Sequence, residues 1–203
     1  MRRHLIAALA TAPLTLAALA ACGTGEPEAA PESPGTSTEA AESPAVPDGV
    51  AEQYGVLTEE VAENGQSMES GPWTVHLITE PAEPWHEVQS DGTSQFREPA
   101  AEETNHIEII PVETATGRIV PDVPITLEVI DAQGNPTEKL DLNFYYSTFF
   151  HYANNFSIPE PGTYTVRATL GVPTFHRHGE ADEQVPLSEG TTVEFDNVEL
   201  GTE

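Results

Sequence analysis

From Trp73 onward, the chain alternates apolar and polar positions in short runs, a pattern that predicts β-strands. Trp73, Val75 and Leu77 are separated by Thr74 and His76, so the apolar side chains share one face. We expect strands over residues 73–78, 105–112, 125–129, 140–146, 156–158, 163–168 and 191–200. Turn signals separate these runs, and residues 81–104 are acidic and proline-bearing, which predicts irregular structure there. This pattern predicts an all-β fold, an antiparallel β-sandwich.

The segment before these strands has a different pattern. Between Cys22 and Pro47 it contains almost no large apolar residue, so it cannot bury a core. We interpret residues 22–70 as an acidic tether rich in proline, glutamate and alanine that leads to a domain at 71–203. Within the tether, apolar residues at helical spacing predict a short helix over 50–63, although this stretch also fits the end of the tether.

The N-terminus has the pattern of a secretory signal peptide over residues 1–21. Arg2 and Arg3 precede an apolar run that is interrupted by Pro13 and is short for a membrane span. The run ends in Leu-Ala-Ala-Cys, which resembles a bacterial lipobox and predicts cleavage before Cys22 and lipidation of its thiol. We therefore expect an extracytoplasmic protein that is lipid-anchored to the bacterial cell membrane.

The charge of the chain narrows the range of partners. The sequence has 34 acidic and 7 basic residues, a formal net charge of -27. Such a chain would repel a phosphate backbone and attract cations, which argues against nucleic-acid binding. Cys22 is the one cysteine, so neither a disulfide framework nor a cysteine-based metal site is expected. The sequence also lacks a Gly-x-Ser-x-Gly motif and a glycine-rich phosphate loop, and we expect a binding protein rather than an enzyme.

The candidate chemistry lies in three β segments. His106 and Glu108 are two residues apart in a run of β-branched residues, so both side chains should point to the outer face of a strand while Ile107 points into the core. An imidazole and a carboxylate side by side form half of a transition-metal site. The other half would come from His151 and from the pair His176 and His178. Taken singly, these histidines fit packed or surface residues as well as ligands.

One further run supports a particular kind of sandwich. Pro161-Gly162-Thr163-Tyr164-Thr165-Val166 is typical of a late strand in an immunoglobulin-like domain, with Tyr164 near a corner. The order His-Ile-Glu-Ile, His-Tyr-Ala-Asn-Asn, Pro-Gly-x-Tyr-x-Val and His-Arg-His resembles the periplasmic ferrous-iron transport protein family. These are dimeric, immunoglobulin-like proteins that bind copper and iron, and they include the treponemal metal-binding lipoprotein antigen.

The resemblance implies a site and a role. Its ligands would be His106, His151 and one of the last pair, preferably His178, with Glu108 as an alternative or additional ligand. It further implies a homodimer with the site near the interface, which supplies iron to a membrane iron permease. A redox role in iron release is an alternative within the same family.

The chain departs from the family pattern at Phe144, where the family has a methionine ligand. Without that thioether, the site should favour a divalent transition metal, whether iron, copper or zinc, over copper(I). Two other functions remain open at this stage. One is a lipoprotein that buffers copper or zinc, and the other is an adhesive or structural immunoglobulin-like module whose histidines do not converge.

Overall fold

The computed structural model describes residues 45–201, and the predicted signal peptide, Cys22 and most of the tether lie outside this range. The described chain forms one helix and twelve strands: α1 Asp48–Asn64, β1 Gly65–Ser70, β2 Trp73–Pro81, β3 Trp85–Val88, β4 Ser94–Arg97, β5 Asn105–Glu113, β6 Arg118–Ile119, β7 Ile125–Ile130, β8 Pro136–Asp141, β9 Asn143–Tyr146, β10 Phe150–Phe156, β11 Gly162–Leu170 and β12 Thr191–Leu200.

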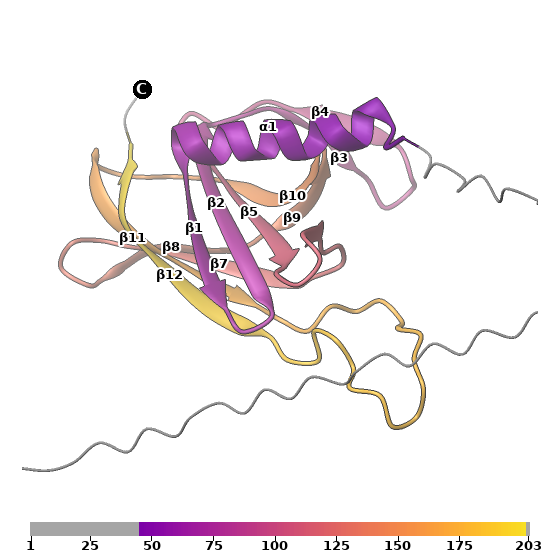
Figure 1. Ribbon diagram of the computed structural model, residues 1–203. Coiled ribbons are helices and arrows are strands. Elements are labelled where there is room, and N and C mark those ends of the chain that lie inside the picture. Colours follow the sequence, from indigo (N-terminus) through magenta and orange to yellow (C-terminus); the bar gives the residue numbers. More distant parts are fainter. Residues whose placement is uncertain (1–44, 202–203) are drawn as a thin grey trace, which may run out of the picture. The chain divides into compact units, whose positions relative to one another are not determined.

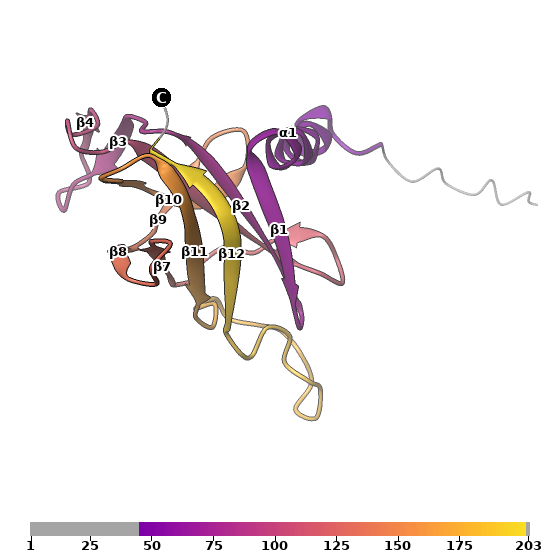
Figure 2. The ribbon, with the colours of Figure 1, turned by 90° about the vertical axis from the view of Figure 1, so that its left-hand side faces the viewer.

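Two antiparallel sheets form a sandwich, as the alternation of apolar residues predicted. The larger, six-stranded sheet has the order β1-β2-β5-β10-β9, with β6 paired to β5, and the smaller has the order β12-β11-β7-β8. Figures 1 and 2 show the two layers facing each other from two directions. Strand β5 lies in the middle of the larger sheet, between β2 and β10. A residue on its outward face therefore has neighbours on both sides.

The main core lies between the sheets and takes alternate residues from each strand. On β5 it takes Ile107 and Ile109, which are fully buried against apolar residues of both sheets. The predicted corner is present as well, since the hydroxyl of Tyr164 donates a hydrogen bond to the carbonyl of Glu160 over 2.6 Å. This tyrosine corner is a hallmark of immunoglobulin-like sandwiches.

A second apolar cluster lies on the outward face of the larger sheet, beneath α1. Leu57 of the helix is buried there against the sheet residues Ile78, Ile110 and Val112. The helix itself agrees with the spacing seen in the sequence. However, α1 and β1 pack on the sheet, so the folded unit begins well before residue 71, where the sequence had placed the domain boundary.

Two other stretches differ from the sequence-based expectation. Residues 85–97, expected to be irregular, form a hairpin in which β3 and β4 pair only with each other within the described chain. Strand β10 begins at Phe150 rather than near 156 and so includes His151. No helix within residues 45–201 has the length and hydropathy that a membrane span requires.

Candidate metal centre

The outward face of β5 carries His106 and Glu108, as the two-residue spacing predicted, but this face is not exposed. His106 is 2% exposed and Glu108 is 6% exposed. The reason is that α1 covers one end of this face, and Trp85 of the β3–β4 hairpin lies over the other, with its ring 6.5 Å from that of His106. The imidazole and carboxylate are therefore held in a low-dielectric environment.

Strand β10 brings a third polar side chain to the same face. The antiparallel register pairs Asn155 with His106 and Ala153 with Glu108, so His151, two residues further along, points the same way. Nε2 of His106 lies 3.7 Å from Oε1 of Glu108, and Nε2 of His151 lies 3.6 Å from the same oxygen. One potential ligand atom from each of the three residues falls within 4.8 Å of the other two.

Hydrogen bonds at the far side of each ring orient these nitrogens. Nδ1 of His106 lies 2.8 Å from Oδ1 of Asn155, and the orientation of that amide is set because its Nδ2 donates to the carbonyl of Glu83 over 2.9 Å. Facing an acceptor oxygen, Nδ1 must carry the proton and Nε2 keeps its lone pair. Nδ1 of His151 similarly faces the carbonyl of Phe149, at 3.4 Å. This outer shell is the arrangement that metal-binding histidines use.

The carboxylate is poorly satisfied by the protein alone. Oε2 of Glu108 is buried and has no hydrogen-bond partner among the described residues. Burial, reinforced by the charges of Glu80, Glu60 and Glu83, raises the pKa of Glu108 to about 8. Burial lowers the pKa of His106, and burial together with the nearby His106 lowers the pKa of His151 to about 4. At neutral pH both imidazoles are thus neutral and Glu108 is mostly protonated, and a cation that displaces this proton would supply the partner that the carboxylate lacks.

The spacing of these ligand atoms, 3.6 and 3.7 Å, suits a small ion. Ala153 is fully buried and lies directly across from Glu108, so the shortest side chain of the β10 face is opposite the carboxylate. Two imidazole nitrogens and a carboxylate oxygen form a donor set that suits divalent zinc, copper or iron. The three residues therefore fit a transition metal on the grounds of donor type, orientation and electrostatics.

The sequence had placed Phe144 beside this site, and the register of β9 corrects that assignment. Phe144 pairs with Tyr152, whose side chain points into the core, and its ring packs on Tyr152 and Phe150. Tyr145 pairs with His151 instead, and its ring stacks on that of His151 with centroids 5.5 Å apart. Tyr145, which the sequence analysis had not singled out, is thus the aromatic residue on the site's face.

The pair His176 and His178 does not join the cluster within one chain. Both are exposed in the loop between β11 and β12, which packs beside Glu113 and Arg118, at the opposite end of β5 from His106. Arg177 between them turns inward, where its guanidinium donates to the backbone carbonyls of Pro186 and Leu187. Arg177 thus anchors the loop, and the adjacent histidines face outward.

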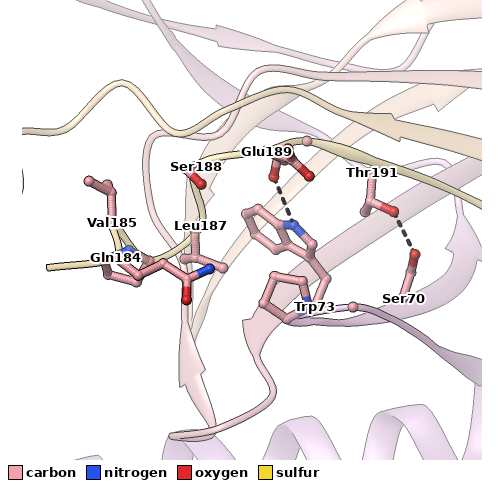
Figure 3. A pocket seen from close by; sticks show the side chains of 12 residues that line it. Ser70, Trp73, Gln184, Val185, Leu187, Ser188, Glu189 and Thr191 are labelled. Carbon is pink, nitrogen blue, oxygen red and sulfur yellow. Dashed lines mark hydrogen bonds between the residues drawn. The ribbon is translucent and has the colours of Figure 1, made fainter.

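A surface hollow with a volume of about 560 Å³ lies away from these ligands. It is lined by the β1–β2 turn and by residues 184–191, and Trp73 contributes its indole N–H to the carbonyl of Glu189 over 3.2 Å. Figure 3 shows this contact and the hydroxyl pair Ser70–Thr191 beside it. Trp73 pairs with Glu113 at one end of β5, whereas Glu80 pairs with His106 at the other. The hollow and His106 are therefore roughly 23 Å apart along the strand.

Comparison with known proteins supports the fold. No family model and no curated protein matches the sequence. The structure is similar to FetP of uropathogenic Escherichia coli, with 18% identity, a TM-score of 0.50, and coverage of 68% of this chain and 95% of that one. It is also similar to copper-reconstituted P19 of Campylobacter jejuni, with 17% identity, a TM-score of 0.52, and coverage of 67% of this chain and 95% of that one. A copper-bound variant of FetP matches with 16% identity, a TM-score of 0.51, and coverage of 68% of this chain and 92% of that one. The neighbours agree with the resemblance drawn from the sequence. At these identities the likeness establishes the shared fold.

Proposed function

We propose that this protein is an extracytoplasmic metal-binding protein that holds one divalent transition metal, iron or copper, on His106, Glu108 and His151. The observation that carries the proposal is the convergence of two Nε2 atoms on a buried carboxylate oxygen. A structural role alone gives no reason to bury this carboxyl group with one oxygen unpartnered, because a buried polar atom without a hydrogen bond destabilises a fold. The copper-bound structures of neighbours with the same fold support copper as one ion to test.

We further propose the role that the family resemblance implies, namely delivery of iron to a membrane permease by a homodimer. Exposed aromatic side chains on β9, the edge strand of the larger sheet, and on its neighbour β10 support a surface for a second copy; they are Phe144, Tyr146 and Phe150. A second copy would also allow its own His178 to approach the cluster, which His178 of the same chain does not reach. In this proposal the lipid on Cys22 keeps the protein at the membrane beside the permease.

Metal analysis tests the site first. Protein purified without an affinity tag should bind one divalent ion per chain. His151→Ala should weaken binding of zinc(II) and copper(II) by at least roughly 100-fold, because losing a ligand should cost more than losing an outer-shell partner. His76→Ala is the matched control, since His76 bonds Ser67 and lies outside the cluster. Equal metal binding by His151→Ala and wild type would rule out the proposed site and favour the alternative of an adhesive module.

Cell experiments test the role separately. Deleting the gene should slow ferrous-iron uptake at limiting iron, and Cys22→Ala should release the folded protein from the membrane. Normal iron uptake combined with sensitivity to excess copper or zinc would instead support a buffering lipoprotein.

A further inference from the structure

The β3–β4 hairpin covers the metal cluster without belonging to either sheet. Residues 82–103 connect β2 to β5 and lie outside the larger sheet. The backbone N–H of Ala82, at the start of this segment, donates a hydrogen bond to the carbonyl of Thr104, just after its end. Because β3 and β4 pair only with each other in the described chain, no ladder of backbone hydrogen bonds fixes them to the sandwich. Their position depends on a few side-chain contacts.

One of these contacts is made by an aromatic ring. Trp85 packs edge-on against Tyr145, with centroids 5.7 Å apart, and lies at a tilt over the His106 ring. The guanidinium of Arg97 lies over the Trp85 ring, 4.1 Å from the ring centroid. Arg97 in turn forms an ion pair with Glu103, near the end of the segment 82–103. Trp85 is thus held between the metal ligands and a charged pair that belongs to the hairpin segment.

The second contact is Asn155, and it joins the hairpin to a metal ligand. Its Oδ1 accepts from Nδ1 of His106 over 2.8 Å and from the backbone N–H of Glu83 over 3.2 Å. Its Nδ2 donates to the carbonyl of Glu83 over 2.9 Å and to Oε2 of Glu103 over 3.3 Å. A single buried amide therefore binds Glu83 and Glu103, near the two ends of the segment 82–103, and orients the His106 ring.

We propose that residues 82–103 form a lid that opens to admit and release the metal, and that Asn155 is the positioning residue that links the closed lid to the orientation of His106. This inference rests on the proposed function, because it concerns exchange at the same site. The ligands are too buried for an ion to exchange while Trp85 stays in place, since His106 is 2% exposed and His151 is 6% exposed. Opening needs only the loss of the side-chain contacts just described, so it can occur without unfolding the sandwich.

The first variant removes the contacts of Arg97 that hold the lid closed, and it changes neither a metal ligand nor a hydrogen bond to one. Arg97→Gln removes the ion pair with Glu103 and the cation over Trp85. Zinc capture and zinc release should both accelerate by roughly tenfold, the value of one or two lost hydrogen bonds, so the Kd should change less than either rate. Stopped-flow transfer of zinc to a chromophoric chelator measures release, and Arg118→Gln, at the opposite end of β5, is the control.

The second variant tests the link through Asn155. Asn155→Asp keeps an oxygen facing His106 but replaces the Nδ2 donor by a carboxylate oxygen that repels Glu103 and the carbonyl of Glu83. Amide hydrogen exchange in residues 82–103 of the metal-free protein should then accelerate, while strands β7 and β11 stay protected. Asn154→Asp is the matched control, because that side chain lies on the opposite face of β10 and bonds the carbonyl of Asp141.

The outcomes separate the lid from the site. Wild-type protein that binds no zinc, copper or iron would overturn the proposed function, and amide exchange in the metal-free variants would still test the lid. Tight zinc binding with unchanged rates and unchanged exchange in both variants would overturn the lid alone. Faster release without faster capture in Arg97→Gln would also overturn it, because that result describes a weakened site behind a fixed cover. If Asn155→Asp fails to fold, the rates of zinc capture and release by Arg97→Gln test the lid.

Discussion

Two halves of one strand face carry opposite chemistry at the same depth of burial. Near its C-terminal end, β5 presents Ile110 and Val112 to Leu57 of α1, and all three are buried in an apolar cluster. Near its N-terminal end, the same face presents His106 and Glu108, which are just as inaccessible to solvent. The first half stabilises the fold through apolar burial. The second half instead keeps a carboxylate without a partner among the described residues, an arrangement that a bound cation would stabilise.

The largest change in stability should come from a substitution in the apolar half of the β5 face. Ile110 is fully buried beneath α1, so Ile110→Ala should lower the free energy of unfolding by about 2–5 kcal/mol. The affinity for zinc should stay close to that of wild type, because no ligand moves. Chemical denaturation and a zinc titration of the same preparation measure both. Zinc binding lost together with stability would show that the two halves of the face are not independent.

The polar half should respond to pH in the absence of metal. Because the pKa of Glu108 is raised to about 8 in the folded state, the folded protein binds this proton more tightly than the unfolded chain does, and stability falls as pH rises toward 8. The two histidines have lowered pKa values, so their contribution has the opposite slope and ends near pH 6.5. Between pH 6.5 and 8 the metal-free protein should lose up to about 2 kcal/mol of stability.

Glu108→Gln is the check on this pH dependence. An amide does not titrate, so the stability of that variant should be nearly flat between pH 6.5 and 8. A wild-type profile that is also flat would mean that Glu108 ionises freely and that its side of β5 is more solvated than the structure shows.

A smaller change, in the affinity for copper(I), should distinguish the two faces of β9. A thioether at position 145 would lie beside His151, whereas one at position 144 would lie among Phe150 and Tyr152. Tyr145→Met should therefore raise the affinity for copper(I) by roughly tenfold through a soft sulfur ligand, and Phe144→Met should leave it unchanged. Competition with a copper(I) chelator compares the two variants directly. A gain in Phe144→Met alone would restore the assignment made from the sequence and contradict the register of β9.

The sequence analysis recovered the features that depend on local periodicity. Alternation placed the principal strands, and the spacing of His106 and Glu108 put both on one face, because side chains in a strand alternate with a period of two. Tyr164 marked its corner through a short motif. Each of these inferences needed only a few neighbouring residues.

The remaining features depend on long-range pairing that such patterns do not specify. Phe144 and Tyr145 exchange roles with a one-residue change in the pairing of β9 with β10, because a shift of one moves every side chain to the other face. The burial of His106 comes from the β3–β4 hairpin, which lies in a segment whose prolines and acidic residues predicted irregular structure. The His-x-His spacing likewise gave no sign that Arg177 would turn inward to anchor the loop.

The most direct test of the account is the number of protons released when the metal binds at pH 7. The raised pKa of Glu108, about 8, and the lowered pKa values of both histidines imply that Glu108 carries a proton and that both imidazoles are neutral. Zinc binding should therefore release close to one proton in wild type and almost none in Glu108→Gln. Isothermal titration calorimetry in buffers of different ionisation enthalpy counts these protons. Equal proton release by the two proteins, or zinc binding of wild-type affinity in both Glu108→Gln and His151→Ala, would contradict a buried site built on His106, Glu108 and His151.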